Sequence, residues 1–179
     1  LSPDADVFVY LGYPGEPAIS NVAFMHRPSA LNNPDSPLGH HWQDATHITF
    51  GVATLGFRYQ NLKLEGSSFT GREPDEARYG FDEPRFDSRA LRLTYNPSAH
   101  LSLQASTSFV KSPEAIEPDE DVYRSTASVL HSKKLAGLNR FWTSTANWGY
   151  NYVDQDHKEH SVLLETSLQN YRTAFYGLY

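Results

Sequence analysis

The chain of 179 residues contains no cysteine, which excludes disulfide bonds, thiolate metal sites and cysteine nucleophiles. Its mean hydropathy is negative, and no run approaches the roughly 18 apolar residues that a membrane-spanning helix needs. The net charge of −6 argues against a nucleic-acid binder that relies on a basic surface. A membrane protein built from strands is not excluded, because only about half of the residues in such strands are apolar.

Catalytic signatures are also lacking. The chain has no G-x-S-x-G elbow, no phosphate-binding P-loop, no H-E-x-x-H pair and no calcium-loop spacing. The acidic residues Glu73, Asp75 and Glu76 and the acidic run at 117–121 are predicted to be solvated loop charge. We therefore expect no enzymatic activity and no resident cofactor. The chain opens at Leu1 without a signal segment, which indicates either a removed signal or an internal fragment.

What the chain does contain is alternation of polar and apolar side chains. In the stretch HLSLQASTSFV, residues 100–110, Leu101, Leu103 and Phe109 fall on one face, and Ser102, Gln104 and Ser108 fall on the other. A side-chain period of two is that of a β-strand with two different faces. Nine such strands are predicted, and helical apolar stripes are almost absent. The predicted strands span residues 6–13, 47–56, 61–69, 87–95, 100–110, 123–132, 139–150, 161–168 and 172–179.

The connections between these strands alternate between long and short. The long ones are 14–46, 70–86, 111–122 and 151–160, and the short ones are 57–60, 96–99, 133–138 and 169–171. Alternation of this kind is typical of antiparallel up-and-down barrels of the bacterial outer membrane, with tight periplasmic turns and longer outer loops. Since such barrels usually have an even number of strands, nine strands predict that residues 1–179 form one domain that is part of a longer barrel.

The polar face of the strands carries charge. Lys63, Glu65, Arg92 and Glu165 alternate with apolar neighbours, and we predict that they face the lumen of the barrel. In the strand at 139–150, Trp142, Trp148 and Tyr150 fall on the same face. Trp142 is near one end of the strand, and Trp148 and Tyr150 are near the opposite end. This arrangement resembles two interfacial aromatic girdles. An aromatic-rich soluble β-sandwich or a lipocalin-like binding module has the same alternation and remains an alternative.

The connection 14–46 contains three histidines, and His47 opens the next predicted strand. Imidazole and carboxylate groups together bind divalent transition metals, so a metal site or a metal-transport role is one alternative. Two others remain open: packing of a loop folded over or into the barrel, and gating by histidine protonation. The candidate metal ligands are His26, His40, His41, Asp44 and His47.

The segment YPGEPAISNVAFMHRPSALNNPDSPLGHHWQDATHITFG is similar to one in a bacterial family of outer-membrane β-barrel proteins, with the run GEPA…AFMHR…PLGHHWQD-THI-FG. The resemblance covers about residues 7–130. It implies an outer-membrane location, a barrel architecture and further strands before and after this chain, but no substrate. We thus expect a porin-like or structural barrel in contact with lipid. Small solutes are candidate cargo, oligomerisation is left open, and nucleic acid is not expected.

Overall fold

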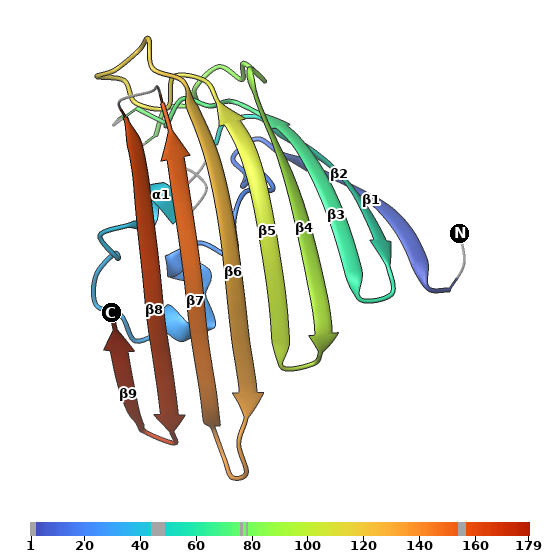
Figure 1. Cartoon of the computed structure of the whole chain (residues 1–179), viewed down its shortest axis with the longest axis vertical. Coiled ribbons are helices and arrows are strands. Elements are labelled where there is room, and N and C mark those ends of the chain that lie inside the picture. The colour runs from blue at the N-terminus through green and yellow to red at the C-terminus, as the bar shows by residue number, and fades with distance from the viewer. Residues whose placement is uncertain (1–2, 44–48, 76, 78, 154–156) are drawn as a thin grey trace.

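The computed structural model describes residues 3–43, 49–75, 77, 79–153 and 157–179. These residues form a nine-stranded antiparallel sheet in which each strand pairs with its neighbour in sequence (Figure 1). The predicted all-β, up-and-down arrangement is therefore confirmed. The strands are β1 (Ala5–Gly12), β2 (Val52–Tyr59), β3 (Leu62–Phe69), β4 (Ser88–Ser98), β5 (Leu101–Val110), β6 (Val122–Lys134), β7 (Arg140–Tyr152), β8 (Lys158–Asn170) and β9 (Thr173–Leu178).

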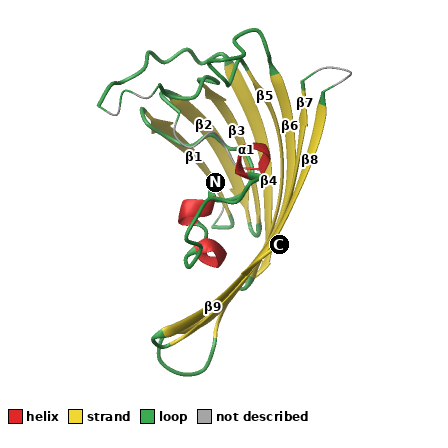
Figure 2. Cartoon of the chain, turned by 90° about the vertical axis from the view of Figure 1, so that its left-hand side faces the viewer, coloured by secondary structure: helices red, strands yellow, loops and turns green. Residues whose placement is uncertain are grey.

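The sheet curls strongly but does not close. Figure 2 shows a concave side, which holds the short helices, and a bare convex side. Among the described residues, β1 pairs only with β2 and β9 only with β8, so the predicted closure into a barrel is not seen. No helix in the described part of the chain is long and apolar enough to cross a membrane.

The two faces of the sheet have opposite polarity. Glu65 and Glu165 on the concave face are each only 4% exposed. Leu55, Leu91 and Val162 on the convex face are 60%, 50% and 67% exposed. The period of two in the strands thus places polar groups inside and apolar groups outside, the reverse of a water-soluble sheet with a buried apolar face.

The predicted boundaries of β2 are wrong. The strand begins at Val52 rather than at residue 47, and it continues through Phe57 to Tyr59. The hairpin turn lies at residues 60–61, where Gln60 has a positive φ of 51°. Gly56 was expected to end the strand, but it lies within it and faces Phe8. A Cβ atom at Gly56 would overlap the Phe8 ring, so the glycine accommodates close packing instead of a turn.

Two connections also differ from the prediction. Pro97 lies within β4 and not in a turn, at a register shift between Tyr95 and Ser98 in the pairing with β5. Proline has no N–H to donate, and a bulge is one of the few places in a sheet that accepts it. The connection from β7 to β8, predicted to be long, is confined to residues 153–157 because both strands extend further than expected.

A small apolar cluster lies on the concave side, at the end of the sheet where the long connections join the strands. Phe69, Val52 and Val110 are almost fully buried, and Ile19 from the β1–β2 connection packs among them. This cluster fixes the place where the connection enters the concave side. Beyond it, the concave face is mainly polar.

Candidate functional site: an inward-folded segment and the cleft beside it

The connection between β1 and β2 folds onto the concave face of the sheet (Figure 2). It contains two short 3-10 helices, η1 (Phe24–His26) and η2 (Pro28–Ala30), and one helical turn, α1 (His40–Gln43). Both η2 and α1 pack against β7 and β8. We call residues 14–43 the inner segment.

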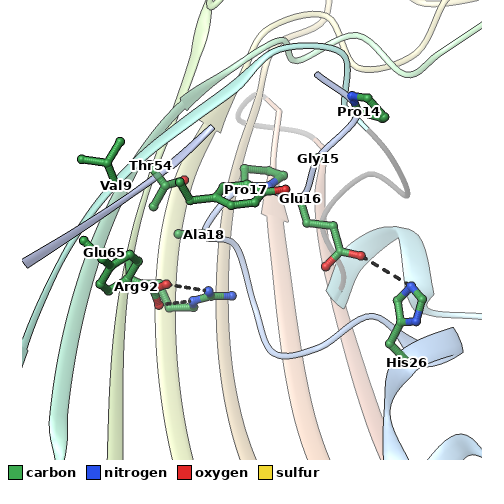
Figure 3. Close-up of a pocket in the computed structure, with 12 residues that line it drawn as sticks. Val9, Pro14, Gly15, Glu16, Pro17, Ala18, His26, Thr54, Glu65 and Arg92 are labelled. Atoms are coloured by element: carbon green, nitrogen blue, oxygen red, sulfur yellow. Dashed lines mark hydrogen bonds and ion pairs between the residues drawn. The ribbon is translucent and has the colours of Figure 1, made fainter. Parts of the chain in front are cut away.

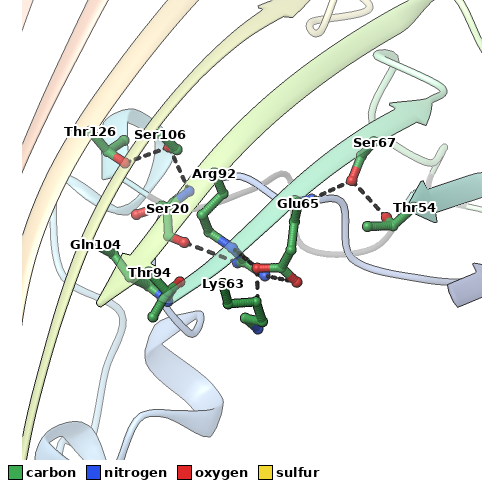
Figure 4. Close-up of polar contacts among 11 residues, drawn as sticks. Ser20, Thr54, Lys63, Glu65, Ser67, Arg92, Thr94, Gln104, Ser106 and Thr126 are labelled. Atoms are coloured by element: carbon green, nitrogen blue, oxygen red, sulfur yellow. Dashed lines mark hydrogen bonds and ion pairs between the residues drawn. The ribbon is translucent and has the colours of Figure 1, made fainter. Parts of the chain in front are cut away.

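The first part of the inner segment runs across the concave face of the sheet, over a row of serine and threonine hydroxyl groups (Figure 4). The backbone N–H of Ala18 donates to Ser67 Oγ on β3, and that of Ser20 donates to Ser106 Oγ on β5, each at 2.8 Å. Ser67 in turn shares a hydrogen bond with Thr54, and Ser106 shares one with Thr126. A buried backbone amide must be paired, and the polar face of the strands supplies acceptors for a segment with little regular structure.

A buried ion pair holds the middle of the inner segment. The guanidinium of Arg27 donates two hydrogen bonds to the carboxylate of Glu165 on β8, and both side chains are almost completely inaccessible. The hydroxyl of Ser29 donates to Glu165 Oε1 at 2.6 Å and is also 2.6 Å from the Thr145 hydroxyl. Arg27 also donates to the backbone oxygen of Val22 at 3.2 Å. This bidentate geometry satisfies both buried charges and fixes the inner segment to β7 and β8.

The turn α1 is attached to the same two strands. Trp42 Nε1 donates to the carboxylate of Glu159, and the amide of Gln43 donates to Ser161 Oγ. The backbone of Trp42 lies so close to Gly149 on β7 that a Cβ atom there would overlap its carbonyl oxygen. Gly149 therefore permits α1 to pack on the strand backbone.

A second Arg–Glu pair lies on the concave face over β3 and β4. Arg92 Nε and Nη2 donate to the two oxygens of Glu65 at 2.9 and 3.1 Å, and Lys63 Nζ is 3.1 Å from Glu65 Oε2. Arg92 also reaches the inner segment, donating to the backbone oxygen of Ser20 at 3.0 Å (Figure 4). The predicted polar-face residues Lys63, Glu65, Arg92 and Glu165 thus lie on the concave face, although they belong to two separate groups.

A cleft of 790 Å³ opens between β1–β4 and the start of the inner segment (Figure 3). Its charged lining consists of Glu65 and Arg92 on the sheet and Glu16 and His26 on the inner segment. Glu16 Oε1 and His26 Nε2 are 3.9 Å apart. The inner segment therefore covers the β7–β8 part of the concave face and leaves a polar cleft over the β1–β4 part.

The predicted histidine ligands are not all brought together. His26 faces Glu16, while His40 Nδ1 lies 2.7 Å from the backbone oxygen of Pro37 and its ring is 4.1 Å from that of His41. His41 instead faces the β3–β4 connection, with its Nδ1 atom 3.6 Å from Glu73 Oε1. Asp44 and His47, the other two predicted ligands, lie outside the described residues.

Electrostatics around His41 favour positive charge. The facing carboxylate of Glu73 raises the pKa of His41 above its ordinary value and outweighs burial, which lowers it. The charge of Glu114 raises the pKa further. Glu73 was predicted to be a solvated loop charge. That prediction was incomplete, because the side chain is only 25% exposed and faces an imidazole contributed by a distant part of the chain.

The sequence prediction missed Arg27 altogether. Its neighbours in the run AFMHRPSA are largely apolar or aromatic, which signals a segment that packs on something. Nothing in that run identifies the partner, because Glu165 lies 138 positions away. An arginine within an apolar stretch of a long connection was the available signal, and it pointed to burial with an unknown carboxylate.

Comparison of the chain with models of known protein families, with curated proteins and with solved structures gave no match. The function of the chain must therefore be inferred from the geometry of its fold.

Proposed function

We propose that the chain forms part of the wall of an outer-membrane β-barrel in bacteria, with the convex face in contact with lipid. The observation that carries the proposal is the inverted polarity of the sheet. Leu91 and Leu93 on β4 are about half exposed on the convex face, whereas Glu65 and Glu165 are buried on the concave face. An apolar outer face and a polar interior are the pattern expected of strands that span a bilayer.

The soluble alternatives account for this pattern less well. A β-sandwich packs two sheets face to face through their apolar sides. The described residues form one sheet, with the short helices of the inner segment on its polar, concave side and a bare convex side (Figure 2). A lipocalin-like module uses its barrel interior to hold a small ligand. Here the inner segment already fills much of the concave side through the contacts of Arg27, Trp42 and Gln43.

The two open edges of the sheet must be paired if the chain forms part of a barrel wall. The outer edges of β1 and β9 carry backbone groups that no other described strand pairs with. In hydrocarbon each unpaired backbone group costs several kcal/mol, so spanning sheets are closed. The proposal therefore requires that further strands pair with both edges in the membrane.

The polar concave side would then be a lumen narrowed by the inner segment. The cleft of 790 Å³ beside Glu65 and Arg92 is the space that remains over β1–β4. Its lining of carboxylate, guanidinium and imidazole groups suits small polar solutes. We accordingly propose passive passage of such solutes, or a structural role in the envelope, without catalysis.

The membrane proposal is tested with two identical substitutions at exposed leucines. Leu93 lies on the convex face of β4, and Leu38 lies in the inner segment and is 96% exposed. The protein is folded into phospholipid vesicles, and the free energy of unfolding is measured by denaturant titration. We expect Leu93→Arg to lower it by about 2–4 kcal/mol, because arginine is costly on the lipid face near the bilayer midplane. Leu38→Arg is expected to change it by less than about 0.5 kcal/mol.

Two outcomes would contradict the membrane proposal. One is an equal effect of the two substitutions in vesicles. The other is a wild-type protein that is folded and monodisperse in plain buffer and does not partition into vesicles. A membrane protein of this class should instead be insoluble without detergent and should migrate differently on gels before and after heating.

A further inference from the structure

We propose that His41, Glu73 and Glu114 form a binding site for a divalent transition-metal cation of the Zn²⁺ type. The three side chains come from three different connections: the inner segment, the β3–β4 connection and the β5–β6 connection. One ligand atom from each of them lies within 4.8 Å of the other two. This site shares only His41 with the ligand set expected from the sequence.

The ligand types fit this cation class. Zinc binds both imidazole nitrogens and carboxylate oxygens, whereas calcium and magnesium prefer oxygen ligands alone. Around tetrahedral zinc, ligand atoms are separated by about 3.4 Å, so the widest separation in this site must close by at most about 1.4 Å. His41 and Glu73 are 47% and 25% exposed, which leaves them room to rotate.

The backbone around the site is already fixed. The N–H of Glu73 donates to the carbonyl of Pro113 at 3.0 Å, next to Glu114 in sequence. The Arg72 guanidinium donates to the backbone oxygen and the hydroxyl of Ser112, which ties the same two connections together. On the third side, the side chains of Trp42 and Gln43 hold α1 to β8. Three segments are thus held around one point before any ligand binds.

A pocket lies at the point where the three side chains meet. A pocket of 170 Å³ is lined by the three ligands, by Arg124 and His157, and by three further carboxylates, those of Glu117, Glu120 and Glu159. Among the described residues of this lining, Arg124 is the only arginine or lysine, and its Nε atom donates to Asn151 Oδ1. Five glutamates around one arginine leave an excess of negative charge, which favours a cation. The bound ion would join the inner segment to two other connections.

The test uses the folded chain in detergent micelles, treated with a chelator and then titrated with Zn²⁺ by calorimetry. Co²⁺ serves as a spectroscopic probe of imidazole ligation. We expect one saturable site per chain. We also expect His41→Ala and Glu114→Gln to weaken binding at least tenfold, because even an indirect partner of a metal ligand contributes about 10- to 100-fold in affinity. The Co²⁺ absorption band should be lost in His41→Ala.

The matched control is Glu117→Gln, which removes the same charge from the same pocket at a residue outside the ligand set. It is expected to change affinity by less than about threefold, as a screened charge beyond the ligands would. Circular dichroism confirms that each variant is folded. The proposal is overturned by the absence of saturable Zn²⁺ binding in the wild type, or by equal losses in Glu117→Gln and Glu114→Gln. Binding of Ca²⁺ as tight as Zn²⁺ and unaffected by His41→Ala would also overturn it.

Discussion

Two arginine–glutamate pairs lie on the concave face, and they are built alike but placed differently. Arg92 and Glu65 are register partners on the neighbouring strands β4 and β3, next to the cleft, and Arg92 is 18% exposed. Arg27 and Glu165 connect the inner segment to β8, and both are almost completely buried. The first pair belongs to the sheet and forms wherever the strands pair. The second exists only when the inner segment is in place.

This difference implies different tasks for the two pairs. An ion pair between neighbouring strands adds to a register that many backbone hydrogen bonds already determine. A buried pair between remote segments helps to fix their relative position, together with the contacts of Trp42 and Gln43. We therefore assign Arg27 and Glu165 to retention of the inner segment, and Arg92 and Glu65 to the polar lining of the cleft.

Removal of Arg27 is expected to have the largest effect. Arg27→Ala leaves Glu165 buried without a counter-charge, and it should lower the free energy of unfolding by about 3–5 kcal/mol. The measurement is denaturant unfolding of the folded protein in detergent, combined with proteolysis of the inner segment. The control is Arg27→Met combined with Glu165→Leu, which leaves no buried charge and should recover much of the stability. If the double variant is as unstable as Arg27→Ala, the loss does not arise from the unpaired carboxylate.

The packing of α1 on the sheet should give an intermediate effect. Gly149→Ala introduces a methyl group that overlaps the backbone of Trp42, and it should lower the free energy of unfolding by about 1–3 kcal/mol. Gly66→Ala in β3 is the matched control, since a Cβ atom there would meet only a carbonyl oxygen at 4.0 Å. It should be neutral or stabilising by up to about 1 kcal/mol. Equal effects of the two substitutions would mean that α1 does not pack on β7.

Removal of Arg92 should have the smallest effect on stability. Glu65 keeps Lys63 at 3.1 Å and lies beside the cleft, so Arg92→Ala should cost about 1 kcal/mol, as a partly exposed ion pair does. The same variant widens the cleft and removes a positive charge from it. If the cleft is the route for solutes, vesicles containing Arg92→Ala should be more permeable to small cations than wild-type vesicles. A stability loss as large as that of Arg27→Ala would remove the distinction between the two pairs.

The strands were largely predictable because their information is local. Alternation over residues 100–110 identifies both β5 and its polar face without any knowledge of the neighbouring strands. The same local argument placed Arg92 and Glu165 on the polar face. It failed at Gly56 and Pro97, because glycine and proline are typical of turns but also occur within strands. Gly56 lies within β2, where it leaves space for the Phe8 ring. Pro97 lies within β4 at a bulge.

The site was less predictable because its contacts join distant parts of the chain. A histidine-rich connection indicated metal ligands, but the spacing of His26, His40 and His41 along the chain does not determine which carboxylates they meet. His41 meets Glu73 because two connections converge at the same end of the sheet. Arg27 meets Glu165 because the inner segment folds inward instead of away from the sheet.

The sequence by itself determined that this chain forms antiparallel strands with one polar and one apolar face, since side-chain alternation with a period of two needs no tertiary information. Only the tertiary structure decided that the connection between β1 and β2 lies against the polar face and leaves a cleft over β1–β4. It also decided that His41, Glu73 and Glu114 converge. The physical reason is that a long connection has no periodic signal of its own, and buried polar partners far along the chain determine its place.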